Sequence, residues 1–411
     1  MPEFLKLQPP FIALEAFLAA IPPSRLGFEK VNTIDALGRV LAKDFISSHP
    51  LPEFPRSTVD GYAVRSADTH GASESLPAIL FMAGEAPMGK TPDMDLQDGQ
   101  AIMIHTGGMI PARADAVVML ENSQLNNAAD LEIYKAVSKN ENVILVGEDV
   151  NKGDLVIPAG RVIRPVEIGG LMSFGATWVD TIKKPKVGIL SSGDEVIPPY
   201  LKPTTGQVRD INTSTMSALV MEAGGSPVPY PIIPDSEEAL TMAVMKAYKE
   251  CDMVLITAGS SASTRDLTSL VIAKLGKPGV LAHGVNVRPG KPTILAVCDG
   301  KPVIGLPGNP VSALVIADIF VKPVIRKLLR ITDKEFRATI DARLMANVAS
   351  AAGREDWLPV ILSQVDHEIV AEPIFFKSNL IFNLVRANAL LHIPADVTGL
   401  QAGENVQVEL L

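Results

Sequence analysis

The chain has 411 residues, 47% of them hydrophobic, so about two to four domains with apolar cores are expected. Its 37 basic and 46 acidic residues give a formal charge of -9, which disfavours a surface for nucleic acid or an anionic membrane. The N-terminus lacks the order of a signal peptide, and no apolar run approaches the roughly 18 residues that span a bilayer. With only Cys251 and Cys298 and no C-x-x-C motif, we predict a soluble cytoplasmic protein without a disulfide framework or structural zinc.

Residues 1–180 carry helical patterns at both ends and strand patterns between them. Short apolar runs from 46 to 142, such as "LPAILFMAGEA", "GQAIMIHTGG" and "ADAVVMLEN", predict a small β domain. Residues 143–180 end in a helix whose first turn suits Pro165, and this segment is expected to rejoin the N-terminal helices. Two helices are predicted within residues 1–45, one from Phe11, Leu14, Phe17 and Leu18, the other from Ile34, Leu37 and Leu41.

From residue 186 strand and helix patterns alternate, which is typical of a parallel sheet with right-handed crossovers. The strands "KVGIL", "PVPYPII" and "DMVLIT" are each followed by a helix, and Asn212 and Asp235 are the predicted N-caps of the first two. After "VLAHGVNV", "TILAV" and "PVIGL" comes one long helix, "NPVSALVIADIFVKPVIRKLL". From about 331 the chain reverts to strand patterns, "ATIDARLMA" and "VQVELL", which predict a small β barrel or sandwich.

Acidic stretches follow the predicted strands and meet at the carboxyl edge of the sheet, where open α/β sheets bind ligands. They contain Asp194 and Glu195 in "SSGDEV", Asp235 before the second helix, and Asp266 in "TAGSSASTRDLT". Each residue alone fits a helix cap. Together they favour a cation, and Mg²⁺ suits one or two carboxylates completed by water and phosphate oxygens.

The stretch "GLPGNPVS" predicts a helix start that can bind an anion. Asn309 suits the N-cap, Pro310 the first helical position and Ser312 the third, while Gly305 and Gly308 would let the backbone approach a ligand.

Two further stretches leave alternatives open. In "VRPGKP", Arg288 and Lys291 flank a Pro-Gly turn, which fits either an oxyanion or phosphate pocket or two solvated charges. In "GQVRDINTS", Asp210 and Asn212 could bind a ribose or cap the following helix, and the residues alone favour the cap.

Short motifs follow one another in a recognisable order: "STVDGYA", "IMIHTGGMIPARADAVVMLEN", "GEDVNKGD", "SSGDEV", "GQVRDIN", "SSASTRD", "VRPGKP", "GLPGNPVSA" and "SNLIFNLVRANALLHIP". This order resembles the MoeA family of molybdopterin molybdenumtransferases, which includes the gephyrin E domain, over about residues 10–409. The resemblance implies a transferase that inserts molybdate into adenylylated molybdopterin with Mg²⁺-dependent release of AMP. Tungstate is nearly the same size and charge as molybdate, so it fits this prediction as well.

The resemblance also implies a multidomain α/β plus β fold. An elongated N-terminal helical and β domain for dimerisation would comprise 1–45 and 143–180, and an inserted β domain 46–142. A MogA-like parallel α/β domain that binds molybdopterin and nucleotide would span 181–330, and a C-terminal β barrel 331–411. The implied partners are a second copy of the chain, a MogA-type adenylyltransferase and molybdoenzymes.

Residue roles carry over by motif. Glu195 and Asp266 match the carboxylates that hold Mg²⁺, and Asp60, Thr106 and Asp149 match positions that complete the cleft from the partner subunit. The catalytic residues implied are Asp60, Thr106, Asp149, Glu195, Asp235, Asp266 and Lys291. The cofactor-binding and molybdate-binding residues implied are Ser192, Gly193, Asp210, Asn212, Gly259, Ser260, Ser261, Arg288, Lys291, Gly308, Asn309, Ser312, Arg354 and Ser378.

The chain departs from the family pattern at three positions. Arg288 replaces a common lysine and keeps its charge. Ala258 and Ser263 stand where glycine is usual, and Ser263 at positive φ would carry strain of about 1–3 kcal/mol. Loss of these glycines favours an alternative, a non-catalytic MoeA-like carrier or scaffold. A second alternative, a MogA-type adenylyltransferase, is disfavoured by the flanking domains and by "VDGYA".

Overall fold

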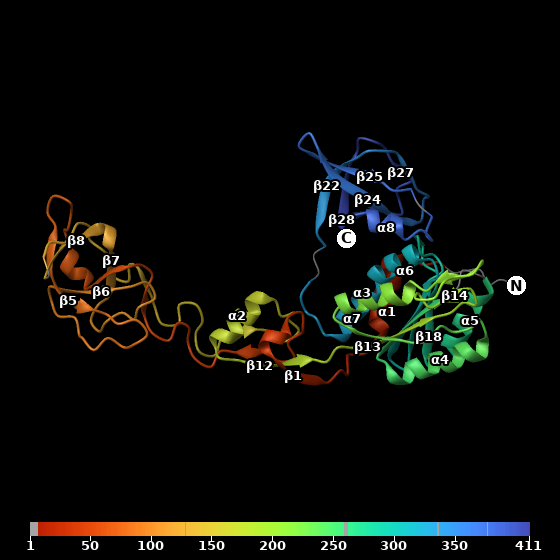
Figure 1. Cartoon of the computed structure of the whole chain (residues 1–411), viewed down its shortest axis with the longest axis horizontal. Helices are drawn as coiled ribbons and strands as arrows, with labels where there is room; N and C mark the ends of the chain where they lie inside the picture. Colours follow the sequence, from red (N-terminus) through yellow and green to blue (C-terminus); the bar gives the residue numbers. More distant parts are fainter. Residues whose placement is uncertain (1–6, 128, 259–261, 335–336, 376) are drawn as a thin grey trace. The chain divides into compact units, whose positions relative to one another are not determined.

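The computed structural model describes residues 7–127, 129–258, 262–334, 337–375 and 377–411. It contains two compact units (Figure 1). Unit 1 is Met1–Ala42, Gly160–Ile168 and Trp178–Leu411, and unit 2 is Lys43–Ala159 and Gly169–Thr177. No helix in the described ranges is long and apolar enough to span a membrane, and both cysteines are buried and unpaired. The division into four domains with the boundaries given above remains a prediction.

Unit 2 contains the predicted β domain. Its main strands are β4 (Gly61–Val64), β5 (Ala78–Glu85), β6 (Gln100–Ile104), β7 (Ala116–Met119), β8 (Ser123–Leu125) and β9 (Asp130–Ile133). They form one sheet in the order β7-β4-β6-β5-β9-β8. Alternating residues of its strands point to opposite faces and pack into a hydrophobic cluster on each face. Gly61 fits where no other residue can, because a Cβ there would collide with the carbonyl oxygen of Val118 on β7.

Smaller elements complete unit 2. Two short strand pairs are antiparallel, β3 with β10 and β2 with β11. The elements are β2 (Phe45–Ile46), β3 (Arg56–Ser57), η2 (Ser66–Thr69), η3 (Leu120–Asn122), β10 (Val143–Ile144) and β11 (Leu155–Ile157).

Two of the three helices predicted in residues 1–180 are confirmed. α1 (Pro10–Ala20) buries Phe17 completely in the core of the α/β sheet of unit 1. α2 (Pro165–Ser173) begins at Pro165, where the fixed φ of proline and its missing N–H cost nothing.

The predicted helix around Ile34 is wrong. The segment instead forms β1 (Phe28–Asn32) and one 3₁₀ turn, η1 (Thr33–Ala36). β1 pairs along its whole length with β12 (Trp178–Ile182), which confirms that residues 143–180 rejoin the N-terminus. Ile34 is 62% exposed, so the helical spacing of the apolar residues did not mark the buried face of a helix. The pairing of β1 with β12 determined the local structure instead of helix propensity.

The central sheet of unit 1 is only partly parallel. Its strands are β13 (Lys186–Ser191), β16 (Ser226–Pro229), β17 (Met253–Ala258), β18 (Pro278–His283), β20 (Ile294–Cys298) and β21 (Lys301–Pro307). In the order β16-β13-β17-β21-β20-β18, the first four are parallel, whereas β20 and β18 are antiparallel. The predicted parallel arrangement is confirmed for the four strands that helices follow. β18, β20 and β21 have no helix between them in the sequence, so β20 and β18 instead form an antiparallel meander with β21.

Helices cover both faces of this sheet (Figure 1). They are α3 (Asn212–Glu222), α4 (Glu237–Glu250), α5 (Ala262–Ala273), α6 (Pro310–Ile316) and α7 (Lys322–Leu328). α1, α3, α6 and α7 pack on one face and α4 and α5 on the other. The single long helix predicted at the end is interrupted by the π turn η4 (Ala317–Val321), because Pro323 has no N–H for a regular helical bond.

The C-terminal β barrel is confirmed. Its strands lie side by side in the order β24 (Glu355–Val365), β25 (Glu368–Pro373), β22 (Thr339–Leu344), β28 (Asn405–Leu410) and β26 (Ala389–Ile393). β26 also pairs with β24, which closes the barrel. The parallel pairing of β19 with β24 attaches the "VRPGKP" segment to its rim. The remaining elements are β14 (Val196–Ile197), β15 (Val208–Arg209), β19 (Val287–Arg288), β22 (Thr339–Leu344), β23 (Val348–Ala349), β24 (Glu355–Val365), β25 (Glu368–Pro373), α8 (Phe382–Arg386), β26 (Ala389–Ile393), β27 (Gly399–Leu400) and β28 (Asn405–Leu410).

Candidate functional site

A cavity of about 240 Å³ lies beyond the carboxyl ends of β13, β17 and β21. This is the edge at which the sequence predicts a ligand site. Predicted residues in its wall are Ser192, Glu195, Asp210, Asn212, Gly308 and Asn309. The other lining residues are Pro310, which was predicted only as the first helical residue, and Ser191, Val196, Val208, Arg209, Ile211, Thr257 and Asn379, which sequence reasoning did not select.

The turn after β13 brings Glu195 into the wall. Ser192 donates its backbone N–H to the carbonyl oxygen of Thr257 at 3.0 Å, which ties the turn to β17. Gly193 has φ of 151°, a region that favours glycine. A Cβ at Gly193 would lie 2.8 Å from Oε2 of Glu195, so the glycine allows that carboxylate to fold back over the turn.

Glu195 in the wall of this cavity interacts with two further carboxylates, those of Asp194 and Asp235. The backbone N–H of Asp235 donates to Oδ1 of Asp194 at 3.1 Å. Partial loss of solvent, followed by the negative charges of Asp194 and Glu195, raises the pKa of Asp235. Asp235 is not the predicted helix cap, because Ser236 accepts from the N–H of Ala239 at 3.1 Å. Its carboxylate is thus held among like charges, an arrangement that a cation would stabilise.

Asp210 caps α3, as the residues alone favoured. Its two carboxylate oxygens accept from the backbone N–H of Thr213 at 3.1 Å and from the Thr213 hydroxyl at 2.6 Å. Asn212 is not the predicted N-cap, because it is the first residue of the helix. Its Nδ2 instead donates to the carbonyl oxygen of Gly308 at 2.8 Å, which links α3 to the segment before α6.

The start of α6 joins the sheet to the segment around Ser378. Asn309 occupies the N-cap position and Pro310 the first helical position, as predicted. Asn309 makes no capping bond, however: its Nδ2 donates to Oγ of Ser378 at 2.9 Å, and Val311 N–H donates to the carbonyl oxygen of Ser378 at 3.2 Å. Ser312, in the first turn, is 4% exposed.

Gly305 does not approach a ligand, contrary to expectation. It lies inside β21, where an added Cβ would come 3.0 Å from Cβ of Ile294 on β20. Its role is close packing between strands.

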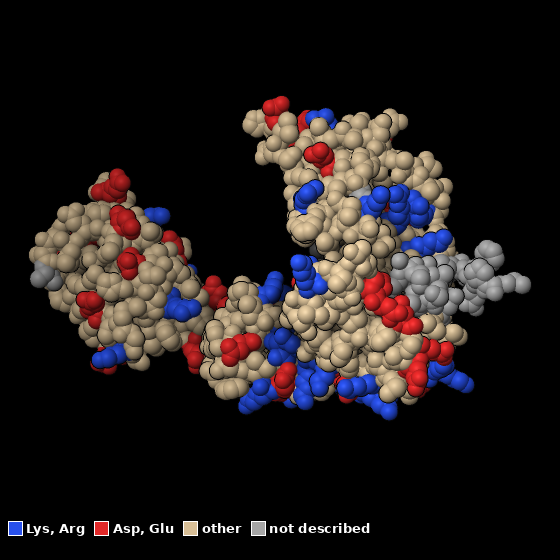
Figure 2. Space-filling view, turned by 45° about the vertical axis from the view of Figure 1, so that its right-hand side comes forward, with Lys and Arg blue, Asp and Glu red and all other residues tan. Residues whose placement is uncertain are grey.

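Two of the predicted cations meet at a carboxylate that was not predicted. Arg354 donates to both oxygens of Asp356, at 2.7 and 2.9 Å, and Arg288 lies 3.6 Å from the same carboxylate. Asp356 is 6% exposed, while Lys291 is exposed. The sequence held a signal, since Asp356 stands two residues after Arg354 at the start of β24, a spacing at which extended residues share a side. Figure 2 shows a group of basic side chains on the barrel and a group of acidic ones on the α/β part below it.

Unit 2 brings two other predicted residues together. Oδ1 of Asp60 accepts from the backbone N–H of Thr106 at 2.8 Å and from its hydroxyl at 3.3 Å. The Thr106 N–H is the main cause of a lowered pKa at Asp60, and His105, 3.5 Å away, adds to it. Asp149 is exposed, and none of the hydrogen bonds or ion pairs of the described residues joins it to Asp60.

Part of the predicted phosphate loop cannot be placed. Gly259, Ser260 and Ser261 lie outside the described residues, and for Asp266 only a backbone position in α5 is described. Ser263 also lies in α5, where a right-handed helix has negative φ, so the strain of positive φ does not arise. In the described part of the chain, no three His, Cys, Asp or Glu residues are grouped to hold a metal ion.

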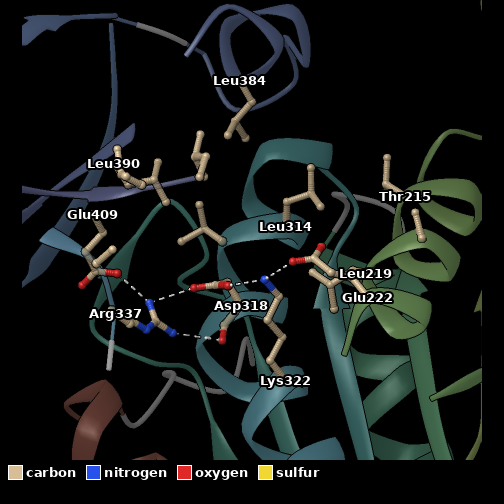
Figure 3. A pocket seen from close by; sticks show the side chains of 15 residues that line it. Thr215, Leu219, Glu222, Leu314, Asp318, Lys322, Arg337, Leu384, Leu390 and Glu409 are labelled. Carbon is tan, nitrogen blue, oxygen red and sulfur yellow. Dashed lines mark hydrogen bonds and ion pairs between the residues drawn. The ribbon is translucent and has the colours of Figure 1, made fainter. Parts of the chain in front are cut away.

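A larger cavity of about 490 Å³, between α3, α6 and the barrel, contains none of the predicted site residues. Figure 3 shows Leu314, Leu384 and Leu390 on one side of it and a chain of ion pairs on the other. Arg337 pairs with Glu409 at 2.7 Å and with Asp318 at 2.8 Å. Lys322 continues the chain from Asp318, at 3.0 Å, to Glu222, at 3.2 Å.

Comparison with known proteins identifies the family. Models of the MoeA N-terminal region (domain I and II), a probable molybdopterin binding domain and the MoeA C-terminal region (domain IV) match residues 12–175, 188–327 and 341–411. A putative molybdopterin biosynthesis protein of Methanocaldococcus jannaschii is 36% identical, covering 93% of this chain and 92% of its own. The molybdopterin molybdenumtransferase of Bacillus subtilis is 31% identical, covering 93% and 90%.

The fold agrees with this match. The crystal structure of the molybdopterin biosynthesis moeA protein of Pyrococcus horikoshii OT3 superposes with a TM-score of 0.85 at 31% identity, covering 99% of this chain and 100% of its own. The chain therefore belongs to the MoeA family, whose curated members include transferases of molybdenum cofactor biosynthesis.

Proposed function

We propose that this protein is a molybdopterin molybdenumtransferase that inserts molybdate into adenylylated molybdopterin and releases AMP with Mg²⁺. The observation that carries the proposal is the cavity at the carboxyl edge, with Glu195 in its wall and the charges of Asp194 and Asp235 near that carboxylate. Sequence identity of 31% to the B. subtilis enzyme of that name supports the same reaction.

The carboxylates fit a hydrated Mg²⁺ shared with substrate phosphates. Such ions use one or two protein carboxylates, and water and phosphate complete the shell, so a cage of three protein ligands is not required. We assign Glu195 and Asp266 as the ligands, with Asp235 alongside. When bound, the ion would neutralise charge on the phosphates.

Arg288, Lys291 and Arg354 would hold the molybdate dianion, with hydroxyls from Ser312 and Ser378. Asp356 offsets one of the three positive charges and fixes the Arg354 guanidinium through two hydrogen bonds, while Arg288 lies 3.6 Å from the same carboxylate. The remaining charge suits a dianion, and fixed donors need little reorganisation when it binds.

We further propose a cytoplasmic homodimer in which Asp60, Thr106 and Asp149 of one subunit complete the cleft of the other. The family resemblance supports this arrangement, and the anion held at Asp60 suits a catalytic position. A MogA-type adenylyltransferase would supply the substrate, and molybdoenzymes would receive the product.

The test is to mix purified protein with adenylylated molybdopterin, Mg²⁺ and molybdate, and to measure AMP and metallated cofactor. Wild type should produce both. Glu195→Gln should lower AMP release by about 100-fold or more, and Asp266→Ala should lose it while still folding. Glu372→Gln, a matched change at an exposed position of β25, should have no effect.

A non-catalytic carrier or scaffold is the second candidate, favoured by Ala258 and Ser263 in place of glycines. Bound substrate without AMP above background would support it. A MogA-type adenylyltransferase is disfavoured by the matches at 12–175 and 341–411, and AMP incorporation from ATP would support it.

A further inference from the structure

The cavity of Figure 3 has the size of a ligand site, and the proposed reaction does not use it. Its volume of about 490 Å³ lies within the range of small-molecule pockets, about 300–1,000 Å³. Among the described residues, none lines both this cavity and the carboxyl-edge cavity. Helices α3 and α6 form one part of its wall and the barrel another, so a ligand bound here would contact both.

One side of the cavity is apolar. Leu314 comes from α6, Leu384 from α8 and Leu390 from β26, and Figure 3 shows the three side chains around the same space. Leu314 and Leu384 are only partly buried. A ligand with an apolar body would therefore remove further apolar surface from water, which favours binding.

The other side of the cavity carries one net negative charge. The charged residues described in its wall are two bases, Lys322 and Arg337, and three acids, Glu222, Asp318 and Glu409. Arg337 pairs with both Asp318 and Glu409, and Lys322 pairs with both Asp318 and Glu222. Burial lowers the pKa of Lys322, but its two carboxylates outweigh burial and the net shift is upward. Since each base already has two carboxylate partners, this side favours a cation over an anion.

Glu409 offers the carboxylate oxygen that a cation can reach. Arg337 binds its Oε2, and none of the hydrogen bonds or ion pairs of the described residues uses Oε1. Oε1 is not among the buried side-chain atoms that lack a partner, so it remains accessible. The Glu409 side chain is 22% exposed, against 71% for Glu222, so water screens its charge less. Leu390 is the residue directly opposite Glu409 on the neighbouring strand, which brings an apolar side chain next to this carboxylate.

We propose that this cavity binds a small amphipathic cation, a molecule with an apolar body and one primary ammonium group. The ammonium donates to Oε1 of Glu409 and neutralises the net charge of the wall. The apolar body lies against Leu314, Leu384 and Leu390. The inference does not depend on the proposed function, because it concerns a separate cavity.

Three probes with the same phenylbutyl body and different head groups test the proposal: 4-phenylbutylamine, 4-phenylbutan-1-ol and 5-phenylpentanoate. Calorimetric titration of the full chain measures their dissociation constants. Wild type should bind the amine about 10-fold more tightly than the alcohol, because the ammonium adds a charge-assisted hydrogen bond, and should bind the carboxylate most weakly. Glu409→Gln should bring the ratio of amine to alcohol affinity close to one. Glu372→Gln, a matched change at an exposed position of β25, should keep the ratio.

Two further measurements locate the site and test the charge. Ala218 is exposed on α3 in the cavity wall, so Ala218→Trp should fill the cavity and weaken all three probes without unfolding the chain. Salt at about 1 M should lower the wild-type ratio without any substitution, since it screens the charge of Glu409. The inference is overturned if the amine does not bind wild type, if Ala218→Trp leaves its binding unchanged, or if the amine preference persists in Glu409→Gln or in high salt. Tighter binding of the carboxylate than of the amine would overturn it as well.

Discussion

Asp60 in unit 2 and Asp235 in unit 1 are both exposed and both predicted to be functional, yet their pKa values shift in opposite directions. The backbone N–H of Thr106 is the first cause of the lowered pKa of Asp60. Loss of solvent and the charges of Asp194 and Glu195 raise that of Asp235. The chain itself therefore stabilises Asp60 as an anion, whereas Asp235 gains from an external cation. The contrast separates a carboxylate in unit 2 that accepts hydrogen bonds from the chain from one in unit 1 that lies among like charges.

The largest expected effect tests whether the two regions act in one site across a dimer. Asp60→Asn and Glu195→Gln should each abolish most AMP release. If unit 2 of one subunit completes unit 1 of the other, each mixed dimer has one intact site and one doubly altered site. Equal mixing after dissociation and reassociation should then restore about a quarter of wild-type activity.

Mixing Glu195→Gln with Asp235→Asn is the control, because both changes lie in unit 1 and leave one alteration in every site of a mixed dimer. No recovery in the Asp60→Asn mixture would show that each subunit carries its own complete site.

The next largest expected effect concerns Glu167, whose carboxylate accepts hydrogen bonds from two arginines, whereas that of Asp60 accepts only from Thr106. Arg164 donates to it at 2.6 Å and Arg161 at 3.2 Å, and the Arg164 bond is the first cause of a pKa lowered to about 2. Glu167→Gln should lower the free energy of unfolding by about 1–3 kcal/mol at pH 7. Denaturant unfolding measures this, with the exposed Glu372→Gln as control.

The pH dependence of this contribution follows from its sign. Because the folded pKa lies below the ordinary value of 4.5, the stabilisation is complete above pH 4.5 and is lost as the pH falls towards 2. The difference between wild type and Glu167→Gln should therefore shrink over that range. A constant difference would assign the effect to packing.

A smaller expected effect is on the stability of the fold, and it has opposite signs at Asp60 and Asp235. The raised pKa of Asp235 means that its charge destabilises the fold above that pKa, and the cost is relieved as the pH falls through it. The lowered pKa of Asp60 gives a stabilisation that is present above 3.8 and lost as the pH falls through the lowered value.

In calorimetry at pH 7 without Mg²⁺, Asp235→Asn should raise the Tm of unit 1 by about 1–3 °C, and Asp60→Asn should lower that of unit 2. Added Mg²⁺ should raise the Tm of wild type more than that of Asp235→Asn. A lower Tm for Asp235→Asn would contradict the repulsion inferred at this edge.

The sequence located the elements better than the contacts between them. Strand and helix periods placed β13, β17 and β21 correctly, because alternation and apolar runs are local signals. They could not place Asp356 beside Arg288, since that pair depends on the long-range parallel pairing of β19 with β24. The capping roles of Asp235 and Asn212 were wrong by one or two residues, because the neighbouring Ser236 and Asp210 accept the backbone N–H groups at the two helix starts.

The smallest expected effect is on stability, and it concerns ion pairs that the chain forms without a ligand or a metal. Arg337 lies between Asp318 and Glu409 in the cavity of Figure 3 and forms an ion pair with each. The chain therefore supplies partners for these two carboxylates, as it does for Asp60, whereas Asp235 lies among like charges. Their side chains are about a quarter exposed, so water and salt weaken the pairs. Arg337→Met should therefore cost no more than about 1 kcal/mol in unfolding free energy, and the difference should shrink in 1 M salt, where the Debye length is only about 3 Å. A loss that persists in high salt would mean that the packing of the aliphatic part of Arg337 contributes more than its charge.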